Sequence, residues 1–214
     1  NSFSNKNNKM KTFQKPKTQP KFGLAIDWET SGSDWNNPEG SHIKYQGLSF
    51  GAIVFDAETF EEIEEVYVEI KFDADKYSWD MGAQKVHGLT REYLEANGIE
   101  REEAAVILAE LIIKYWGPEG RVMFLGHNID FDIKFTKQLL GDFGIPLNKH
   151  HVQLDTSGTG MIALGIFKSD QLFEALGFEK RGEHNALQDV KMTLETCKIF
   201  RALMTYAAEE FYPD

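Results

Sequence analysis

The order of apolar and polar residues predicts three strands in the first third of the chain. Residues 24–26 form a short apolar run inside a strand expected over 22–28. A second strand is expected over 46–55 and a third over 63–72, where apolar and polar side chains alternate. The polar segment 56–59 lies between these two strands and predicts a hairpin turn.

Helical spacing replaces this alternation further along the chain. Apolar residues between 104 and 115 follow a helical repeat, and Gly117 with Pro118 ends that helix. Residues 121–126 predict a buried strand, and another helix is expected to begin after Asn128. The last helix has a predicted core face of Ala186, Val190, Thr193, Leu194, Cys197, Phe200 and Met204. Hairpin strands followed by alternating helices and strands predict an α/β fold, with a mixed sheet covered by helices.

The length of 214 residues suits one α/β domain, expected over 22–214, with 42% apolar residues to fill a core. Cys197 is the single cysteine, which excludes an internal disulfide and a Cys-based zinc site and fits a reducing compartment. No apolar run approaches the roughly 18 residues that a membrane helix needs, and no signal-peptide pattern is visible. We therefore expect a soluble, cytoplasmic protein with no membrane partner.

The charge is distributed unevenly. The whole chain has a net charge of −11, but residues 1–21 contain six lysines and no acid. The rest therefore carries 17 basic and 34 acidic residues, a net charge of −17, which argues against broad electrostatic binding to duplex nucleic acid. Residues 1–21 predict a flexible tail, either a basic arm for nucleic acid or simply solvated. The chain begins with Asn and its first methionine is Met10. One interpretation is that part of this tail comes from an expression vector.

Asp27 and Glu29 end the first predicted strand. Residues two apart in a strand point to the same side, about 7 Å from each other. Two acids on one face of a buried strand end are costly unless a positive charge lies between them. Carboxylate oxygens suit Mg²⁺ or Mn²⁺, so the pair predicts a metal site. The alternative is an ordinary acidic start to the turn expected at 31–33.

A second acidic segment follows the predicted strand 121–126. With Asn128 as the expected N-cap, Asp130 falls in the first helical turn, where the exposed amides stabilise a carboxylate. Asp132 lies beside Phe131 at the edge of the apolar face. The helix dipole gives less reason for a carboxylate at this deeper position. Asp132 is therefore the predicted functional acid.

The third segment covers residues 182–189. Asn185 is the expected N-cap of the last helix, and Gln188 three positions later completes a capping box. His184 then lies on a loop just outside the helix, while Asp189 lies in its first turns. A histidine beside a fixed carboxylate suits a general base next to a metal ligand. The alternative is a capping or surface histidine.

Together, these segments resemble the DEDDh family of 3′→5′ exonucleases in the RNase H-like superfamily. Its members include the proofreading subunit of bacterial replicative polymerase, RNase T and oligoribonuclease. The likeness covers roughly residues 22–204, with further matches at 50–54, 86–90 and 154–156. The sister group has Tyr where this chain has Asn185, so the histidine branch is indicated. The matching motifs are Asp27-x-Glu29, Asn128-x-x-Phe131-Asp132 and His184-x-Ala186-x-x-Asp189.

The resemblance implies an RNase H-like fold, a five-stranded mixed sheet flanked by helices. It also implies that Asp27, Glu29, Asp132 and Asp189 bind two Mg²⁺ or Mn²⁺ ions, with Asp27 bridging, and that His184 takes the proton of the attacking water. Four carboxylates in one cleft repel by about 4 kcal/mol for each pair at 4 Å, at an effective dielectric constant near 20. Two divalent ions would cancel this charge, one helping to activate the water and the other stabilising the departing 3′ oxygen. Histidine changes its charge near neutral pH, which suits the proposed base.

Substrate contacts follow from the same resemblance. The backbone amides of Thr30 and Ser31 are expected to meet the terminal 3′ hydroxyl. Trp28, Phe131 or Trp35 can stack on the terminal bases, and packing in the core or a loop is the alternative for each.

The remaining histidines are assigned structural roles. They are His87, His127, His150 and His151. No pair among them has the i, i+4 metal spacing with an adjoining acid. Asp155 is expected to cap the helix that follows it.

The implied activity is divalent-metal-dependent release of 5′-mononucleotides from single-stranded or frayed 3′ ends. Trp28 is bulkier than the aliphatic residue usual in the family, and the loop 33–41 is longer, so the choice between DNA and RNA stays open. One alternative is an RNase H-like binding module that docks a polymerase or a replication complex. Another is a metal-dependent endonuclease, which would not need the histidine motif. The complete set of four acids and a histidine favours the exonuclease.

Overall fold

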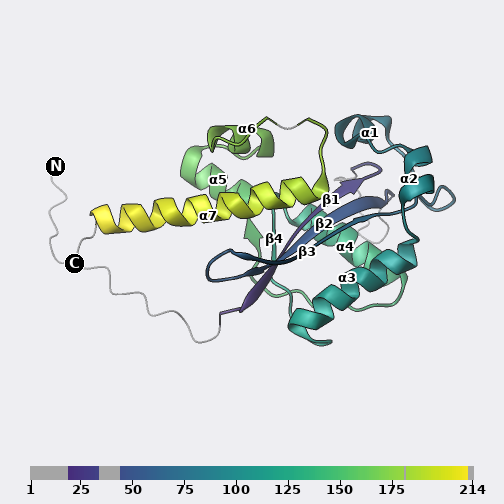
Figure 1. The fold of residues 1–214 in the computed structure, drawn as a ribbon, viewed down its shortest axis with the longest axis horizontal. Coiled ribbons are helices and arrows are strands. Elements are labelled where there is room, and N and C mark those ends of the chain that lie inside the picture. The colour runs from purple at the N-terminus through teal and green to yellow at the C-terminus, as the bar shows by residue number, and fades with distance from the viewer. Residues whose placement is uncertain (1–18, 34–43, 181, 212–214) are drawn as a thin grey trace.

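The computed structural model describes residues 19–33, 44–180 and 182–211. The predicted basic tail therefore lies outside the described residues except for 19–21, as do Trp35 and most of the 33–41 loop. The described residues fold into one sheet with helices on both faces (Figure 1).

The sheet is five-stranded and mixed, as predicted, with the strand order β3-β2-β1-β4-β5. β2 pairs antiparallel with β1 and β3, whereas β4 lies parallel to β1 and to β5. The carboxyl ends of β1 and β4 therefore meet at the same edge of the sheet. The strands are β1 (Phe22–Thr30), β2 (Gly47–Asp56), β3 (Glu62–Glu69), β4 (Phe124–Gly126) and β5 (Leu154–Asp155).

The first strand is longer than predicted and continues through Thr30. Asp27 and Glu29 consequently lie inside the strand, where they pair with Gly51 and Ser49 of β2. The hydrogen-bonded ladder thus holds the backbone of both acids, whose side chains lie on the same face of the sheet.

Two other strands are shorter than predicted. β3 ends at Glu69, and Ile70 forms only an isolated bridge with Ile99. The strand expected over 121–126 begins three residues later, because Val122 forms only an isolated bridge with Lys149.

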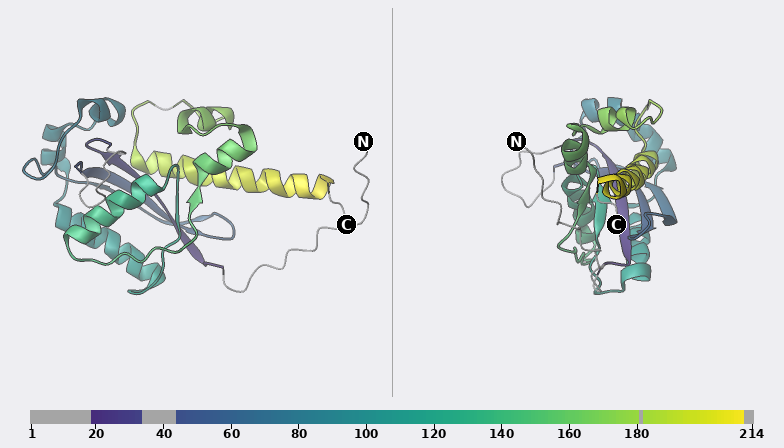
Figure 2. Two further views of the ribbon diagram at one scale, coloured as in Figure 1. Left: turned by 180° about the vertical axis from the view of Figure 1, so that it is seen from behind. Right: turned by 90° about the vertical axis from the view of Figure 1, so that its left-hand side faces the viewer.

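The helices are divided between the two faces of the sheet. α3 and α4 pack on one face and α7 runs along the other, as the view from behind shows (Figure 2). α1 and α2 lie beyond the carboxyl end of β1 (Figure 1). The helices are α1 (Met81–His87), α2 (Arg91–Asn97), α3 (Arg101–Trp116), α4 (Asp130–Asp142), α5 (Thr156–Leu164), α6 (Ser169–Ala175) and α7 (Ala186–Phe211).

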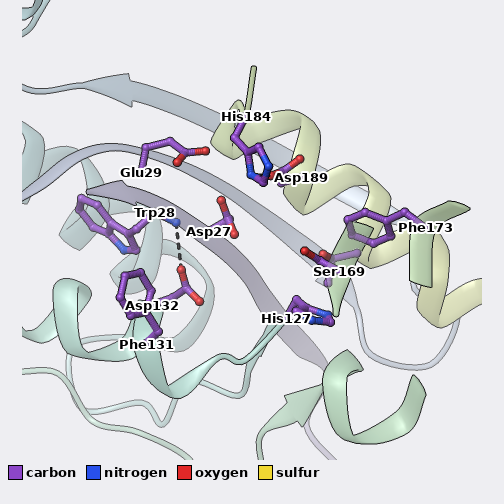
Figure 3. A pocket seen from close by; sticks show the side chains of 11 residues that line it. Asp27, Trp28, Glu29, His127, Phe131, Asp132, Ser169, Phe173, His184 and Asp189 are labelled. Atoms are coloured by element: carbon purple, nitrogen blue, oxygen red, sulfur yellow. Dashed lines mark hydrogen bonds and ion pairs between the residues drawn. The ribbon is translucent and has the colours of Figure 1, made fainter. Parts of the chain in front are cut away.

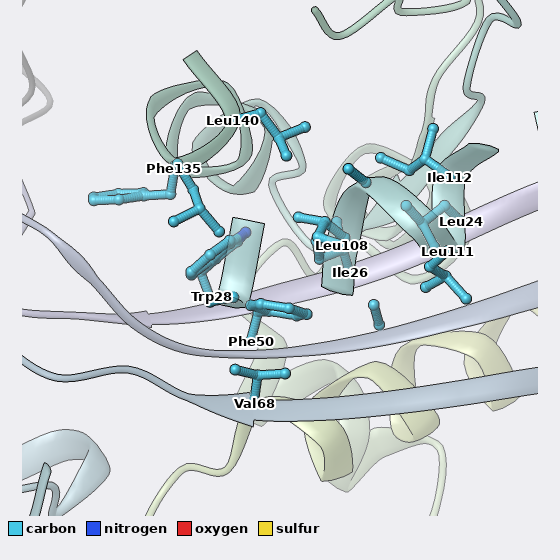
Figure 4. Packing of buried hydrophobic residues seen from close by; sticks show 14 of the residues in the cluster. Leu24, Ile26, Trp28, Phe50, Val68, Leu108, Leu111, Ile112, Phe135 and Leu140 are labelled. Carbon is cyan, nitrogen blue, oxygen red and sulfur yellow. The ribbon is translucent and has the colours of Figure 1, made fainter. Parts of the chain in front are cut away.

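Alternation along β1 separates two hydrophobic cores. Leu24, Ile26 and Trp28 point into the larger core beneath α3 and α4, where Trp28 packs against Phe50 (Figure 4). Ala25 points to the opposite face and belongs to the core under α7. Because side chains alternate with a period of two, Asp27 and Glu29 also face α7.

Helix ends were predicted with mixed success. Asn128 is not the N-cap of α4, because the helix begins at Asp130 and Asn128 takes a left-handed conformation with φ 64°. Asp155 caps α5 as predicted, since its carboxylate accepts from Ser157 N at 2.8 Å. The same carboxylate accepts the amide of Asn128 at 3.1 Å, so it also anchors the turn before α4. The predicted cap Asn185 is confirmed by the bond from Gln188 N to Asn185 Oδ1 at 3.2 Å.

One predicted core residue of the last helix is wrong. Met204 is 70% exposed, whereas Val190 and Leu194 are buried against the sheet. The carboxyl-terminal part of α7 extends beyond the sheet, so its inward side has nothing in the described sheet to pack on (Figure 1).

Candidate active site

The carboxyl ends of β1 and β4 carry the first part of the site. Asp27 and Glu29 project from β1 toward α7, and the chain after β4 turns through Asn128 into α4. This arrangement brings the first turn of α4 beside the two acids. Parallel strands commonly place ligand sites at such an edge.

The start of α7 rests directly on β2. A Cβ atom added to Gly51 would lie 2.4 Å from Leu187 Cα and 2.6 Å from the carbonyl carbon of Ala186. Gly51 is the β2 partner of Asp27, so this close approach sets α7 over the acidic face of β1. Asp189, in the first turn of the helix, is thereby brought to the same space.

Asp132 reaches the site from the opposite core. It lies in the first turn of α4, is 2% exposed, and its Oδ1 accepts the amide of Trp28 at 2.9 Å. Burial, and then repulsion from Asp27, raises the pKa of Asp132 well above its ordinary value, against the lowering effect of the Trp28 hydrogen bond. A buried carboxyl of this kind favours a proton or a cation beside it.

His184 lies on the loop before α7. Its backbone amide donates to Val86 O at 3.1 Å, which ties the loop to the end of α1. Its Nδ1 lies 3.2 Å from Asp189 Oδ2, and its side chain is 27% exposed. The neighbouring Glu183 packs against Gly88 at the end of α1. A Cβ atom added to Gly88 would lie 2.5 Å from Glu183 Oε2.

One cavity unites these groups. Its volume of about 130 Å³ leaves room for ions with their water. Ligand atoms of Glu29, His184 and Asp189 lie within 4.8 Å of one another. The side chains turn toward a common space (Figure 3). The cavity is lined by Asp27, Trp28, Glu29, His127, Phe131, Asp132, Ser169, Phe173, His184, Asp189 and Thr193.

The donor set fits divalent cations. Carboxylates of Asp27, Glu29, Asp132 and Asp189 offer hard oxygen ligands to a single cavity. Three of them, Glu29, Asp132 and Asp189, are at most 8% exposed, so water screens their mutual repulsion poorly. Cations would offset this repulsion.

The predicted substrate contacts fare less well. The amide of Ser31 donates to Gln46 O at 2.8 Å, so it is already paired, and its predicted contact with a 3′ hydroxyl stays a prediction. Thr30 is 7% exposed and its hydroxyl donates to Gly32 O, and neither Thr30 nor Ser31 is among the described residues that line the cavity. Ser31 and Gln46 lie 15 positions apart in the sequence, so the residues around Ser31 alone do not predict this hydrogen bond.

The two aromatic candidates differ. Trp28 is 4% exposed and packs on Phe50 with ring centroids 4.9 Å apart, so core packing is its role and a base has no open face there. Phe131 is half-buried in the cavity wall and packs at a tilt against Phe135. Stacking of Phe131 on a terminal base stays a prediction.

The site also includes residues that the motifs did not single out. His127 lines the cavity, where Nδ1 lies 3.0 Å from Thr156 Oγ1 and Nε2 lies 2.8 Å from Phe167 O. These bonds agree with the structural role expected for it. Ser169 and Phe173 of α6 complete the wall, and no spacing in the sequence pointed to them.

The other histidines lie outside the cavity lining. His87 is 5% exposed and its Nδ1 accepts from Leu89 N at 3.0 Å. Burial lowers the pKa of His87. His150 and His151 pack together with ring centroids 4.2 Å apart.

Comparison with known families agrees with the geometry of the cavity. A family model for the RNase T type, described as exonuclease, matches residues 24–197. The chain belongs to this exonuclease family. The predicted family resemblance is therefore confirmed, and the predicted RNase H-like fold is confirmed by the solved structures that match.

Relatives of this exonuclease-family chain include the 3′-5′ DNA exonuclease Cap18 of Escherichia coli. The two are 25% identical over 191 residues, which cover 87% of this chain and 95% of Cap18. A zinc-bound complex of E. coli exonuclease I with single-stranded DNA matches with a TM-score of 0.67 and 22% identity. A complex of exonuclease I with a dT13 oligonucleotide matches with a TM-score of 0.65 and 22% identity. The match to the zinc-bound complex covers 86% of this chain but 41% of exonuclease I, so the chain spans less than half of that protein.

None of the helices in the described part of the exonuclease-family chain is long and apolar enough to cross a membrane.

Proposed function

We propose that this chain is a 3′→5′ exonuclease that releases 5′-mononucleotides from single-stranded or frayed DNA ends, within one domain over residues 22–214. The observation that carries the proposal is the convergence of four acids and His184 on one cavity, in a chain of an exonuclease family. Cap18 is named a DNA exonuclease and exonuclease I is seen with single-stranded DNA, which favours DNA over RNA. The net charge of −17 outside residues 1–21 further favours short contacts at a strand end over a long duplex track.

Asp27, Glu29, Asp132 and Asp189 would hold two Mg²⁺ or Mn²⁺ ions. When bound, these ions supply positive charge that activates the attacking water and stabilises the departing 3′ oxygen. The sheet holds the backbones of Asp27 and Glu29, while Trp28 N orients Asp132 through Oδ1. The backbones of Asp27 and Glu29 and the carboxylate of Asp132 would thus be positioned before substrate arrives.

His184 would take the proton from water. Its Nδ1 faces Asp189 Oδ2 at 3.2 Å, so with the Nδ1 proton donated there, Nε2 is the nitrogen that accepts a proton. The contact with the Asp189 carboxylate orients the ring, so that Nε2 rather than Nδ1 is the nitrogen free to take the proton.

Phe131 would contact the terminal base. It lines the cavity next to Asp132 and is half-buried, which leaves part of its ring for stacking. Cytoplasmic location and docking to a polymerase or replication complex stay predictions.

A degradation panel tests the proposal. Single-stranded DNA labelled at the 3′ end should lose its label as a mononucleotide at once, while a 5′-labelled strand should shorten stepwise. Closed circular single-stranded DNA should stay intact, and EDTA should stop the reaction. The Asp132→Asn protein, purified identically, controls for a contaminating nuclease. Cutting of the circle would favour an endonuclease, and binding without any cleavage would favour a binding module.

A further inference from the structure

We propose that Thr136 and the Trp28 indole act as positioning residues that orient Asp132 for metal binding. The inference rests on the proposed function, because it gives Asp132 the role of a metal ligand. It adds residues that do not touch the ions or the substrate themselves.

A closed ring of hydrogen bonds carries the proposal. Trp28 N donates to Asp132 Oδ1 at 2.9 Å, and Trp28 Nε1 donates to Thr136 Oγ1 at 3.0 Å. Thr136 Oγ1 in turn donates to Asp132 O at 2.9 Å. The ring therefore joins both the carboxylate and the carbonyl of Asp132 to a single residue of β1.

All three members are withdrawn from solvent. Trp28 is 4% exposed, Asp132 2% and Thr136 0%. A hydroxyl has one proton to donate and can accept through its lone pairs, so Thr136 uses its donor on Asp132 O and accepts from the indole. Buried hydrogen bonds of this kind are costly to break, because water does not replace them.

The ring gives a reason for a tryptophan between two acids of β1. The indole fills the space between β1 and α4, where it packs on Phe50, and it carries the one donor that reaches Thr136. Asp27 and Glu29 point to the other face, toward α7, so Trp28 supports the site from behind. An aliphatic side chain would fill part of this space but would supply no hydrogen bond.

Outer groups that orient metal ligands typically change metal affinity or activity by about 10- to 100-fold when removed. Thr136→Val keeps the volume and branching of the side chain but removes the hydroxyl. We expect its Mn²⁺ affinity to fall by about that factor. Thr136→Ser restores the hydroxyl and should restore most of the affinity. Trp28→Phe keeps the backbone amide and an aromatic ring but removes Nε1, and should weaken Mn²⁺ binding in the same direction.

A matched control separates positioning from general destabilisation. Thr196 is 0% exposed and donates to Met192 O four residues back, as Thr136 does to Asp132, but it is not among the cavity-lining residues that the structure describes. Thr196→Val should lose a similar amount of thermal stability and keep Mn²⁺ affinity and turnover.

The experiment measures free Mn²⁺ by electron paramagnetic resonance during titration of each purified full-length variant, together with its melting temperature. Weaker binding by Thr136→Val than by Thr196→Val, with recovery in Thr136→Ser, supports the proposal. Equal affinity in both valine variants overturns it, even when wild type binds Mn²⁺ and degrades DNA. Wild type that binds no Mn²⁺ overturns the proposed function as well. If Thr136→Val does not fold, the other two variants decide. Weaker Mn²⁺ binding by Trp28→Phe than by Thr136→Ser supports the proposal, and equal binding overturns it.

Discussion

The two walls of the cavity are built differently. On one wall, Asp132 is 2% exposed and is bonded to Trp28 of β1, which forms part of the sheet ladder. On the other, the His184 side chain is 27% exposed, and its loop is tied to α1 by the hydrogen bond from His184 N to Val86 O. The first wall is held by a packed core and the second by a helix start and a loop.

The difference matches the two chemical tasks that the proposed function assigns to the cavity. Holding cations requires several oxygens at set positions, which strands and buried hydrogen bonds provide. Moving a proton requires exchange with water, which a partly exposed histidine permits. Asp189 joins the tasks, because it lines the cavity and also faces His184 Nδ1.

The largest expected effect comes from Asp132→Asn, which alters the buried wall. Activity should be lost, because a charged metal ligand is removed. Since the pKa of Asp132 is raised, its protonated form stabilises the metal-free fold, and this contribution is lost as pH rises through the raised pKa. In EDTA, the variant should therefore melt above wild type, with a larger difference at pH 8 than at pH 5. A variant that keeps activity, or melts below wild type at pH 8, would contradict this assignment.

His184→Ala tests the exposed wall. Loss of a general base should lower kcat by about 10²–10⁴-fold, while Mn²⁺ binding and melting temperature stay close to wild type. His151→Ala is the control, because His151 is exposed and lies outside the cavity lining. More than half of wild-type activity in His184→Ala would leave His184 as a surface or capping residue.

Gly51→Ala should disturb the junction between the walls. The new methyl would lie 2.4 Å from Leu187 Cα, so the start of α7 has to move and Asp189 moves with it. Overpacking of this kind costs about 1–3 kcal/mol, and turnover should fall together with the free energy of unfolding. Gly141→Ala is the matched control, since a Cβ there meets nothing within 4 Å. Denaturant unfolding and kinetics on the same preparations measure both effects; equal behaviour of the two variants would refute the close packing at Gly51.

The smallest effect is expected from Asp130→Asn. Asp130 lies in the first turn of α4 and is exposed, so it stabilises the helix end by about 0.3–1 kcal/mol. Turnover should remain near wild type while urea unfolding shows that small loss. If Asp130→Asn abolished cleavage and Asp132→Asn did not, the roles of the two acids would have to be exchanged.

The sequence by itself determined the sheet class, the family and the set of acids. Alternation along β1 placed Asp27 and Glu29 on one face, and the cap at Asn185 set the phase of the helix that carries Asp189. These features depend on backbone periodicity and on bonds between residues near one another in the chain, which a linear pattern records.

Tertiary structure decided what the neighbouring residues do. Trp28 points into the core because its indole donates to Thr136 and packs on Phe50 there, and the Ser31 amide is paired because Gln46 O accepts it. Asn128 is not a helix cap, since the Asp155 carboxylate holds its amide in a turn. Each of these outcomes depends on a partner from another strand, helix or loop. A local pattern does not contain that partner, so only the packed chain could assign the role.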